Sequence, residues 1–175
     1  MGTSLNKQYL TLAGKPILAY TIDVFERCPL VNEIVVIINP NEQEIFKRQI
    51  LNRGHYKKVN IAFGGRSRQE SVYRGLQKVN TQCQMVLIHD GARPLSDGDL
   101  ILRCIYETIK HHATIVAVPA KNTIKVVNSQ LGVEYTPNRK LLYEVQTPQT
   151  FDFDLIMKAH EQAIEEHAEV TDDAA

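Results

Sequence analysis

A carboxylate, a glycine and an arginine follow a strongly apolar run in the middle of the chain. The run 85–88 leads into His89-Asp90-Gly91-Ala92-Arg93-Pro94, and ligands of open α/β sheets bind beyond the carboxyl ends of the strands. There Asp90 could hold Mg²⁺ that carries phosphate oxygens, and Arg93 could grip a phosphate in a forked contact. In the structural alternative, Asp90 caps the turn and pairs with Arg93. The segment predicts phosphate binding, with that pairing as the competing interpretation.

Two glycines stand immediately before a segment of helical period. Gly64 and Gly65 precede Ser67, and Ser67 and Glu70 have the spacing of a capping box. Glycines at a helix start let a ligand approach the backbone and meet free N–H groups, so this turn could hold part of a nucleotide. The alternative is a plain glycine turn before a capped helix. The turn has neither the GK[ST] ending of a Walker A loop nor the GxGxxG dinucleotide pattern.

Isolated basic and hydroxyl side chains add weaker signals. Lys7 lies just ahead of the first helical segment, where its charge could stabilise a triphosphate, although a surface lysine is the ordinary interpretation. Arg139 and Thr147 carry little information singly. The histidines lack an HExxH pattern and the three cysteines lack CxxC spacing, so no metal site of those kinds is predicted.

Composition argues against several classes of function. The 20 basic and 20 acidic residues leave no net charge, basic residues are spread along the chain and Trp is absent, so we expect no nucleic-acid partner. No apolar run approaches the length of a membrane span, and the N-terminus does not resemble a signal peptide. We therefore expect no membrane association and a cytoplasmic protein.

The periodicity of the chain indicates which elements position these residues. Apolar runs bounded by turn residues alternate with helical segments, as in βα units around a mainly parallel sheet. We expect strands at 34–38, 59–63, 85–88 and 114–118, and helices at 16–28, 42–51, 67–79, 97–110 and 153–167. Two short β-type runs, 123–127 and 133–135, predict a protruding hairpin. The length fits one domain.

Taken together, these segments resemble the cytidylyltransferase family of the methylerythritol phosphate route to isoprenoids. They match it in order over nearly the whole chain: Lys7-Gln8-Tyr9, Gly64-Gly65 with Arg68 and Ser71-Val72, His89 to Pro94, Asn122-Thr123-Ile124-Lys125, Arg139, Gln146-Thr147-Pro148-Gln149 and Thr171-Asp172-Asp173-Ala174. The resemblance implies a Rossmann-like α/β nucleotidyltransferase domain spanning 1–175. It also implies a β-arm at 120–138 that joins a homodimer, and transfer of a cytidylyl group from CTP to 2-C-methyl-D-erythritol 4-phosphate.

The resemblance also assigns expected roles residue by residue. Lys7 and Arg139 would be catalytic, and Asp90 would bind Mg²⁺. The nucleotide would lie against Gly64, Gly65, Ser71, Asp90 and Gly91. The polyol phosphate would be held by Arg93, Thr123, Arg139, Thr147 and Thr171, some of them from the neighbouring subunit.

The sequence departs from the family pattern in three places. The family opens with a β-strand and a glycine-rich loop, of which only Met1-Gly2 is present here, and it continues beyond the Thr171-Asp172-Asp173-Ala174 segment. Arg66 stands where an acidic residue is common. The missing strand and loop support one alternative, a truncated non-catalytic scaffold. A second alternative is ribitol-5-phosphate cytidylyltransferase, a relative with the same chemistry; its counterpart of Gly91-Ala92 is usually Ser-Val, so this sequence favours it less. A dinucleotide-dependent oxidoreductase is not supported, because GxGxxG is missing.

Overall fold

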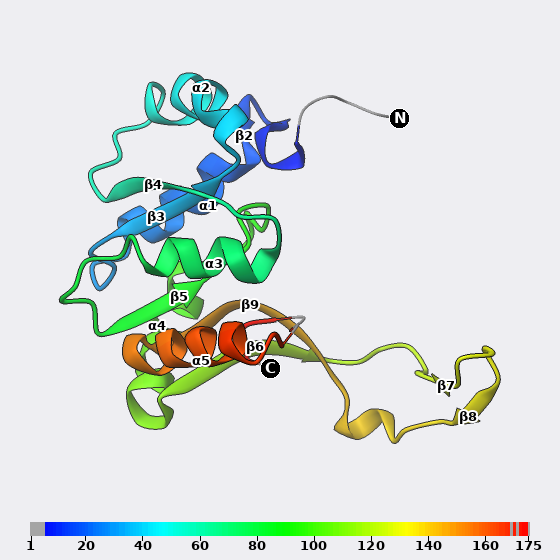
Figure 1. Cartoon of the computed structure of the whole chain (residues 1–175). Helices are drawn as coiled ribbons and strands as arrows, with labels where there is room; N and C mark the ends of the chain where they lie inside the picture. The colour runs from blue at the N-terminus through cyan, green and yellow to red at the C-terminus, as the bar shows by residue number, and fades with distance from the viewer. Residues whose placement is uncertain (1–5, 169, 171, 175) are drawn as a thin grey trace.

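The computed structural model describes residues 6–168, 170 and 172–174 of the chain (Figure 1). The elements of the first half are η1 (Lys7–Tyr9, a 3-10 helix), β1 (Thr11–Leu12), β2 (Lys15–Pro16), α1 (Ile17–Arg27), β3 (Ile34–Ile38), η2 (Pro40–Glu42), α2 (Gln43–Phe46), η3 (Lys47–Leu51, a π-helix), β4 (Val59–Phe63) and α3 (Arg68–Leu76). Those of the second half are β5 (Met85–Ile88), α4 (Gly98–His111), β6 (Ala113–Pro119), β7 (Val126–Val127), β8 (Val133–Tyr135), η4 (Arg139–Leu141), β9 (Tyr143–Asp152) and α5 (Phe153–Glu165).

The first βα layer is built on two parallel strands. β3 pairs with β4 in register, Ile34 opposite Val59, and both strands have the predicted bounds. Successive strand residues point to opposite faces. Ile38 packs with α1, whereas Ile37 lies against Gly75 of α3. The two helices therefore cover opposite faces of this pair (Figure 1).

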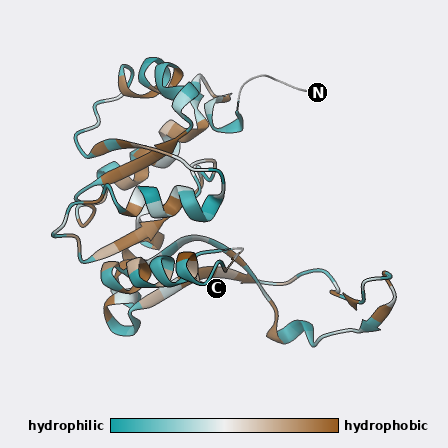
Figure 2. Cartoon of the chain, viewed as in Figure 1, coloured by the Kyte–Doolittle hydropathy of each residue, from teal (hydrophilic) through white to brown (hydrophobic). Residues whose placement is uncertain are grey.

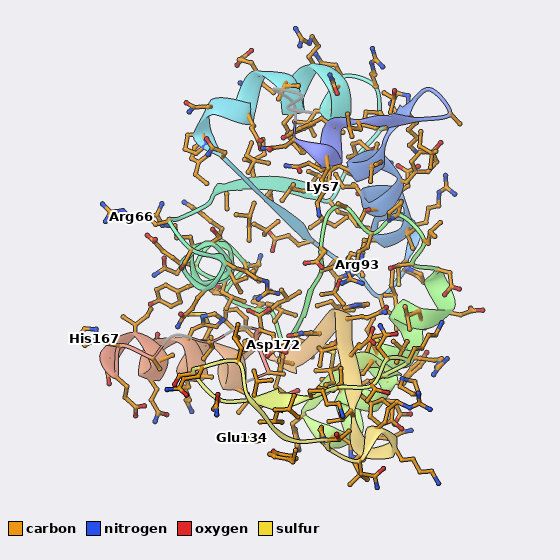
Figure 3. All side chains as sticks on the ribbon, turned by 90° about the vertical axis from the view of Figure 1, so that its right-hand side faces the viewer. Lys7, Arg66, Arg93, Glu134, His167 and Asp172 are labelled. Atoms are coloured by element: carbon orange, nitrogen blue, oxygen red, sulfur yellow. The ribbon has the colours of Figure 1, made fainter. Side chains whose placement is uncertain are left out.

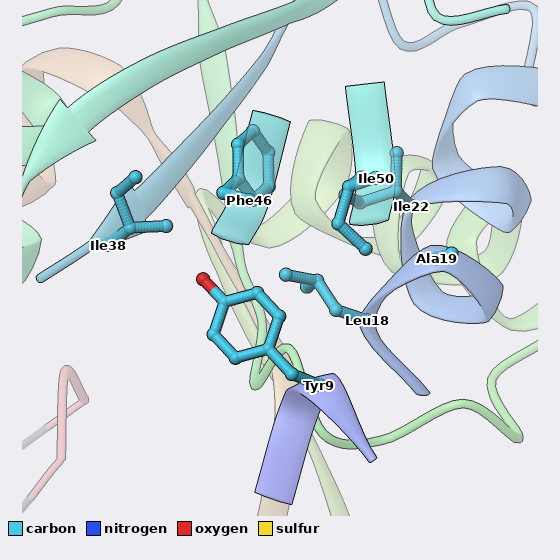
Figure 4. Packing of buried hydrophobic residues seen from close by; sticks show 7 residues of the cluster. All are labelled: Tyr9, Leu18, Ala19, Ile22, Ile38, Phe46 and Ile50. Atoms are coloured by element: carbon cyan, nitrogen blue, oxygen red, sulfur yellow. The ribbon is translucent and has the colours of Figure 1, made fainter. Parts of the chain in front are cut away.

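A hydrophobic cluster anchors the N-terminal segment to this layer. Its buried members are Tyr9, Leu18, Ala19, Ile22, Ile38, Phe46 and Ile50 (Figure 4). Tyr9 is only 1% exposed, and it belongs to η1, which also carries Lys7. Burying a large aromatic side chain contributes about 1.5–3 kcal/mol, so the cluster fixes the position of η1.

The second layer corrects the expectation of a mainly parallel sheet. β9 lies between β5 and β6 and runs antiparallel to both. β5 and β6 are thus parallel to each other without touching. Among the described residues, hydrogen-bonded parallel pairing is found in β3 and β4. The fold is α/β as predicted, but its strands form separate sheets.

The predicted hairpin is present as an arm that extends away from the body (Figure 1). Its paired strands are β7 and β8; β8 has the predicted bounds, whereas β7 is shorter than the expected 123–127. All three residues of β8 are exposed. With these residues exposed, the arm has little packing of its own. A two-stranded hairpin of this kind is marginally stable alone.

The helices largely follow their sequence signals. Ser67 caps α3 by accepting from the Glu70 N–H at 3.0 Å, and Asp97 caps α4 by accepting from the Leu100 N–H at 2.8 Å. The helix expected at 42–51 is divided into η2, α2 and the π-helix η3. Within the described ranges, no helix has both the length and the apolar character needed to traverse a bilayer.

Candidate functional site

Seven of the residues predicted for the site surround one large cavity. The cavity, of about 1570 Å³, lies beyond and between β3 and β5. The predicted residues that line it are Lys7, Gly64, Gly65, Ser71, Asp90, Gly91 and Arg93. Figure 3 shows Lys7, Arg93 and Asp172 along one face of the molecule. We call the polar rim formed by these seven residues and Arg68 the mouth of the cavity.

Lys7 is held at the mouth by its neighbours in η1. The buried Tyr9 hydroxyl donates to Glu42 at 3.3 Å, and Asn6 also hydrogen-bonds Glu42. Burial, reinforced by the nearby Glu42 carboxylate, raises the pKa of Tyr9, so this phenol stays protonated and donating. The Lys7 side chain itself is exposed. Its ammonium group is therefore available to an anion at the rim.

The glycine turn differs from the expected set of free N–H donors. The Gly65 N–H donates to Ser71 Oγ at 2.9 Å, and the Arg66 N–H donates to a Glu70 carboxylate oxygen at 2.6 Å. A Cβ on Gly65 would overlap the Glu70 carboxyl group, so glycine is needed for this close approach. The turn is therefore ordered by its own side chains, and a ligand would meet its backbone with these donors already engaged.

The turn after β5 shows the pairing that was the structural alternative for Asp90. Arg93 Nε donates to Asp90 Oδ2 at 2.8 Å, and the Arg93 N–H donates to the Asp90 carbonyl at 3.1 Å. The Asp90 N–H donates to Thr147 Oγ1 at 3.1 Å, which brings the predicted Thr147 against the mouth although it does not line the cavity. Both charged side chains are partly exposed, so the pair remains accessible to ligands.

His89 and Thr21 support this turn from behind. The His89 ring lies 5.1 Å from the Phe25 ring, and its Nε2 lies 3.3 Å from Ser96 Oγ. Burial lowers the pKa of His89, so the ring is neutral near pH 7. The Thr21 hydroxyl donates to the Gly91 carbonyl at 3.0 Å. His89 is a structural neighbour of Asp90, as predicted, and Thr21 is a support that the sequence did not indicate.

A buried ion pair ties the C-terminal segment to the mouth. Arg68 Nη2 lies 2.5 Å from Asp173 Oδ2, and the Asp173 side chain is only 2% exposed. The Asp173 N–H donates to Gln149 Oε1 at 3.1 Å. Burial alone would lower the pKa of Arg68, but Asp173 and the nearby Asp90 and Asp172 raise it above its ordinary value. Residue spacing could not have revealed this pair, because 105 positions separate its members.

The remaining predicted residues lie elsewhere. Thr123 and Arg139 belong to the arm and its base and do not line the cavity. Arg139 is exposed, and its Nη1 donates to the Lys121 carbonyl at 2.9 Å. Thr171 lies outside the described residues. One chain therefore assembles the nucleotide half of the predicted site and leaves its arm residues apart from it.

The mouth has the charges that suit a polyphosphate. Lys7, Arg68 and Arg93 bring positive charge to the rim, and Asp90 provides an accessible carboxylate. Where the structure describes the chain, no group of three or more His, Cys, Asp or Glu side chains could chelate a metal by itself. Mg²⁺, however, commonly binds through one or two carboxylates together with substrate phosphates. Asp90 fits that limited role.

Comparison with known proteins gives one consistent result. A family model described as 2-C-methyl-D-erythritol 4-phosphate cytidylyltransferase (IspD) matches residues 1–175. Curated proteins of that name from Clostridioides difficile and Alkaliphilus oremlandii are 44% and 45% identical to the chain. Each match covers 99% of this chain, and 73% and 74% of those proteins respectively.

Solved structures agree with the sequence matches. The crystal structure of 4-diphosphocytidyl-2C-methyl-D-erythritol synthase from Anaerococcus prevotii superposes with a TM-score of 0.89 at 33% identity, covering 99% of this chain and 75% of that one. The cytidylyltransferase from Francisella tularensis gives 0.83 at 30% identity, covering 98% and 78%.

Proposed function

The chain belongs to the 2-C-methyl-D-erythritol 4-phosphate cytidylyltransferase family, and we propose how the residues at the mouth of its cavity serve the reaction of that family. The protein is a nucleotidyltransferase that joins CTP and 2-C-methyl-D-erythritol 4-phosphate into CDP-methylerythritol and releases pyrophosphate. The observation that supports the site assignment best is the grouping of Lys7, Asp90 and Arg93 around one cavity beyond the strand ends.

CTP would occupy the mouth of the cavity. Gly64, Gly65, Ser71 and Gly91 line the side where the cytosine and ribose would lie, and Lys7 lines the side for the triphosphate. A Cβ on Gly91 would come within 2.9 Å of Leu18 Cδ1, so the backbone of this turn approaches α1 closely. The glycines keep both turns compact, because Glu70 fills the space beside Gly65 and Leu18 the space beside Gly91. The base would lie against the remaining backbone of these turns.

A divalent cation would be held by Asp90 and by phosphate oxygens of CTP. Asp90 Oδ2 accepts from Arg93 in the structure, which leaves Oδ1 for a metal ligand. When bound there, Mg²⁺ would offset negative charge on the triphosphate. Arg93 would then turn part of its guanidinium group toward the phosphate of the second substrate.

Methylerythritol phosphate would be bound from two directions. Arg93 and Thr147 approach it from the body, where Thr147 contacts the Asp90 turn. Thr123 and Arg139 are exposed on the arm and its base, and Thr171 completes the proposed set. We place the two arm residues in the site of a neighbouring subunit, which makes the enzyme a homodimer joined through the arm at 120–138.

The chemistry then requires positioning and positive charge. An oxygen of the substrate phosphate attacks the α-phosphorus of CTP, the bond to the β-phosphate oxygen breaks, and pyrophosphate leaves. Lys7 and the neighbour's counterpart of Arg139 would stabilise the charge that develops on the phosphate oxygens. No side chain forms a covalent bond to the substrate, so holding the two phosphates in line is the main task of the protein.

Pyrophosphate release tests this function directly. The purified chain, with its intact mass confirmed, is incubated with CTP, Mg²⁺ and either methylerythritol phosphate or ribitol 5-phosphate. We expect release with the first substrate. Release with ribitol 5-phosphate alone would reassign the substrate, and a folded protein inactive with both would contradict the site described above.

Mixing two inactive variants tests the shared site. Lys7→Ala removes a body residue and Arg139→Ala removes an arm residue. If each site takes its arm residues from the neighbour, half of the subunits in a 1:1 mixture form mixed dimers with one intact site each, and about a quarter of the wild-type activity returns. Activity that stays at the level of the separate variants would place both residues in the same subunit.

A further inference from the structure

Thr21 is a polar residue on the apolar face of α1. That face also presents Leu18, Ile22 and Phe25 to the interior, at the spacing of a single helical stripe. Thr21 is only 5% exposed. A valine would have nearly the same shape there, whereas a buried hydroxyl costs free energy unless it is hydrogen-bonded. A threonine at this position therefore needs a partner.

The partner of Thr21 lies outside its own helix. A threonine in a helix commonly bonds the carbonyl one turn back in that helix. The Thr21 hydroxyl instead donates to the Gly91 carbonyl at 3.0 Å, across 70 positions of sequence. Leu18, on the same face of α1, also lies close to Gly91. The turn that carries Asp90 thus rests on α1 through one hydrogen bond and one close approach.

This turn depends on hydrogen bonds more than the strand before it does. β5 is strongly hydrophobic (Figure 2) and pairs with β9 along its whole length. Residues 90–93 carry no large apolar side chain, so packing alone holds them weakly. Thr147 of β9 accepts from the Asp90 N–H, and Thr21 of α1 donates to the Gly91 carbonyl. Two threonine hydroxyls therefore hold the turn from two different elements.

The same helix also fixes the position of Lys7. Leu18 belongs to the buried cluster that contains Tyr9 (Figure 4), and Tyr9 shares η1 with Lys7. One helix therefore holds both the segment that carries Lys7 and the turn that carries Asp90. The separation of these two charged groups depends on how firmly each segment is attached to α1.

We propose that Thr21 is a positioning residue for the cytidylyl transfer: its hydroxyl fixes the Asp90 turn on α1 and so sets the separation between the Asp90 carboxylate and the Lys7 ammonium group. This role rests on the proposed function, in which Lys7 contacts the triphosphate of CTP and Asp90 holds a divalent cation that carries phosphate oxygens. A binding group misplaced by about 1 Å can cost about a hundredfold in rate. The attachment of the turn therefore matters to the reaction as well as to the fold.

Loss of the hydroxyl should affect one part of nucleotide binding. Without Thr21 as its donor, the Gly91 carbonyl loses a hydrogen bond, and the turn is free to shift away from α1. Asp90 would then meet the cation less well. Contacts of the base with the glycine turn at 64–65 would stay as they are. The expected loss is therefore confined to the cation-dependent part of the affinity for CTP.

Two substitutions at this position separate the hydroxyl from the packing. Thr21→Val keeps the shape and removes the donor, whereas Thr21→Ser keeps the donor and removes a methyl group. Thr108→Val is the matched control, because Thr108 is also buried in a helix but its hydroxyl has no hydrogen-bond partner within the described part of the chain.

Two measurements are made on the full chain. Hydrogen exchange is followed at the Asp90 and Arg93 amides, both of which are hydrogen-bonded in the turn, and it needs no ligand. Exchange in the middle of α1 shows whether each variant keeps its fold. Calorimetry gives the Kd for CTP, once with Mg²⁺ and once with EDTA.

We expect exchange at both turn amides to be about three- to tenfold faster in Thr21→Val, the size of effect that one lost hydrogen bond produces. The Kd for CTP should rise by a similar factor with Mg²⁺ and stay unchanged with EDTA. Thr21→Ser should keep the wild-type values even where its melting temperature is lower, and Thr108→Val should keep them too. Equal changes in Thr21→Ser and Thr21→Val would overturn the proposal, because packing would then be the cause.

Failure of the proposed function gives a different result from failure of this role. A folded wild-type chain whose affinity for CTP does not depend on Mg²⁺ would contradict the site described above and, with it, the role of Thr21. If the wild-type affinity does depend on Mg²⁺ and Thr21→Val shows the same dependence, the role of Thr21 alone is overturned, whatever the exchange rates.

Discussion

The mouth of the cavity and the arm carry residues of the same predicted site in very different surroundings. At the mouth, three segments are tied to the body by a buried side chain: Tyr9 holds η1, Thr147 holds the Asp90 turn and Asp173 holds Arg68 at the start of α3. On the arm, β8 is wholly exposed, and the exposed Arg139 side chain donates a hydrogen bond to the Lys121 carbonyl of its own chain. A single chain thus fixes the first set in place, whereas in the proposed function the second set acts on a neighbouring subunit.

Removing Arg139 should separate activity from stability most clearly. For Arg139→Ala we expect turnover to fall by about 10²–10³-fold, the usual cost of a lost charge-stabilising group. The free energy of unfolding should change by less than about 0.5 kcal/mol, as for other exposed positions. Steady-state kinetics and urea unfolding measure the two effects. Lys140→Ala is the matched control, and equal loss of activity and stability in Arg139→Ala would contradict the distinction.

Removing the charge of Asp173 should lower both stability and the affinity for CTP. Asp173→Asn leaves Arg68 without its buried partner, and we expect a loss of about 1–3 kcal/mol in the free energy of unfolding, less than for a fully buried pair because Arg68 is partly exposed. The KM for CTP should rise as Arg68 leaves the mouth. Asp172→Asn, at the neighbouring carboxylate, is the control. If Asp173→Asn keeps full stability, the buried pair is not an anchor.

Acid should destabilise the surroundings of the Arg68–Asp173 ion pair. Burial lowers the pKa of His160, although Asp173 at 3.8 Å opposes this effect and Arg68 adds to it. As the pH falls below about 6.5, His160 is therefore protonated in the unfolded chain before it is protonated in the folded chain. The contribution of neutral His160 to stability is complete above that pH and is lost below it. Burial lowers the pKa of His89 as well, so protonation of His89 in acid also lowers the free energy of unfolding.

Urea unfolding at several pH values between 7 and 5 measures this effect. The free energy of unfolding should decline with acid, and the decline should be shallower in His160→Gln than in the wild type. His167→Gln, on the same C-terminal part of the chain, is the control. Parallel curves for the wild type and His160→Gln would show that His160 does not carry the effect.

The smallest effect is expected at the glycine turn. In Gly65→Ala the new methyl group displaces the Glu70 carboxylate, which then loses its hydrogen bond from the Arg66 N–H. Loss of one such bond costs about 0.5–1.5 kcal/mol. We expect a similar fall in stability and a rise of a few-fold in the KM for CTP. Gly98→Ala, where a Cβ meets open space, should change neither quantity.

The sequence predicted local elements well and long-range pairings poorly. β3, β4 and β5 have the expected bounds, because continuous branched apolar runs leave few alternatives. β9 was missed since its Gln146-Thr147-Pro148-Gln149 stretch is polar and contains proline, a composition that argues against a central strand. Its antiparallel course is also why the sheet is not the mainly parallel one expected.

The same limit applies to the site. Asp90 and Arg93 could be placed at a strand end from sequence, and the structure brings Lys7 and the glycine turn to them. Arg68 paired with Asp173, and Thr21 bonded to the Gly91 carbonyl, join residues far apart in the chain. Only packing reveals such contacts, since neither spacing nor periodicity encodes them.

The position of β9 has a consequence for the order in which the protein can fold during synthesis. Within the described chain, β5 and β6 each find their ladder partner in β9, which follows them and the whole arm in sequence. While a ribosome is still making the arm, these two strands have no partner and their apolar edges are open. The β3–β4 pair, by contrast, can form from segments already released. Nascent chains are thus most exposed to misassociation during translation of residues 89–142, a natural point for chaperone engagement.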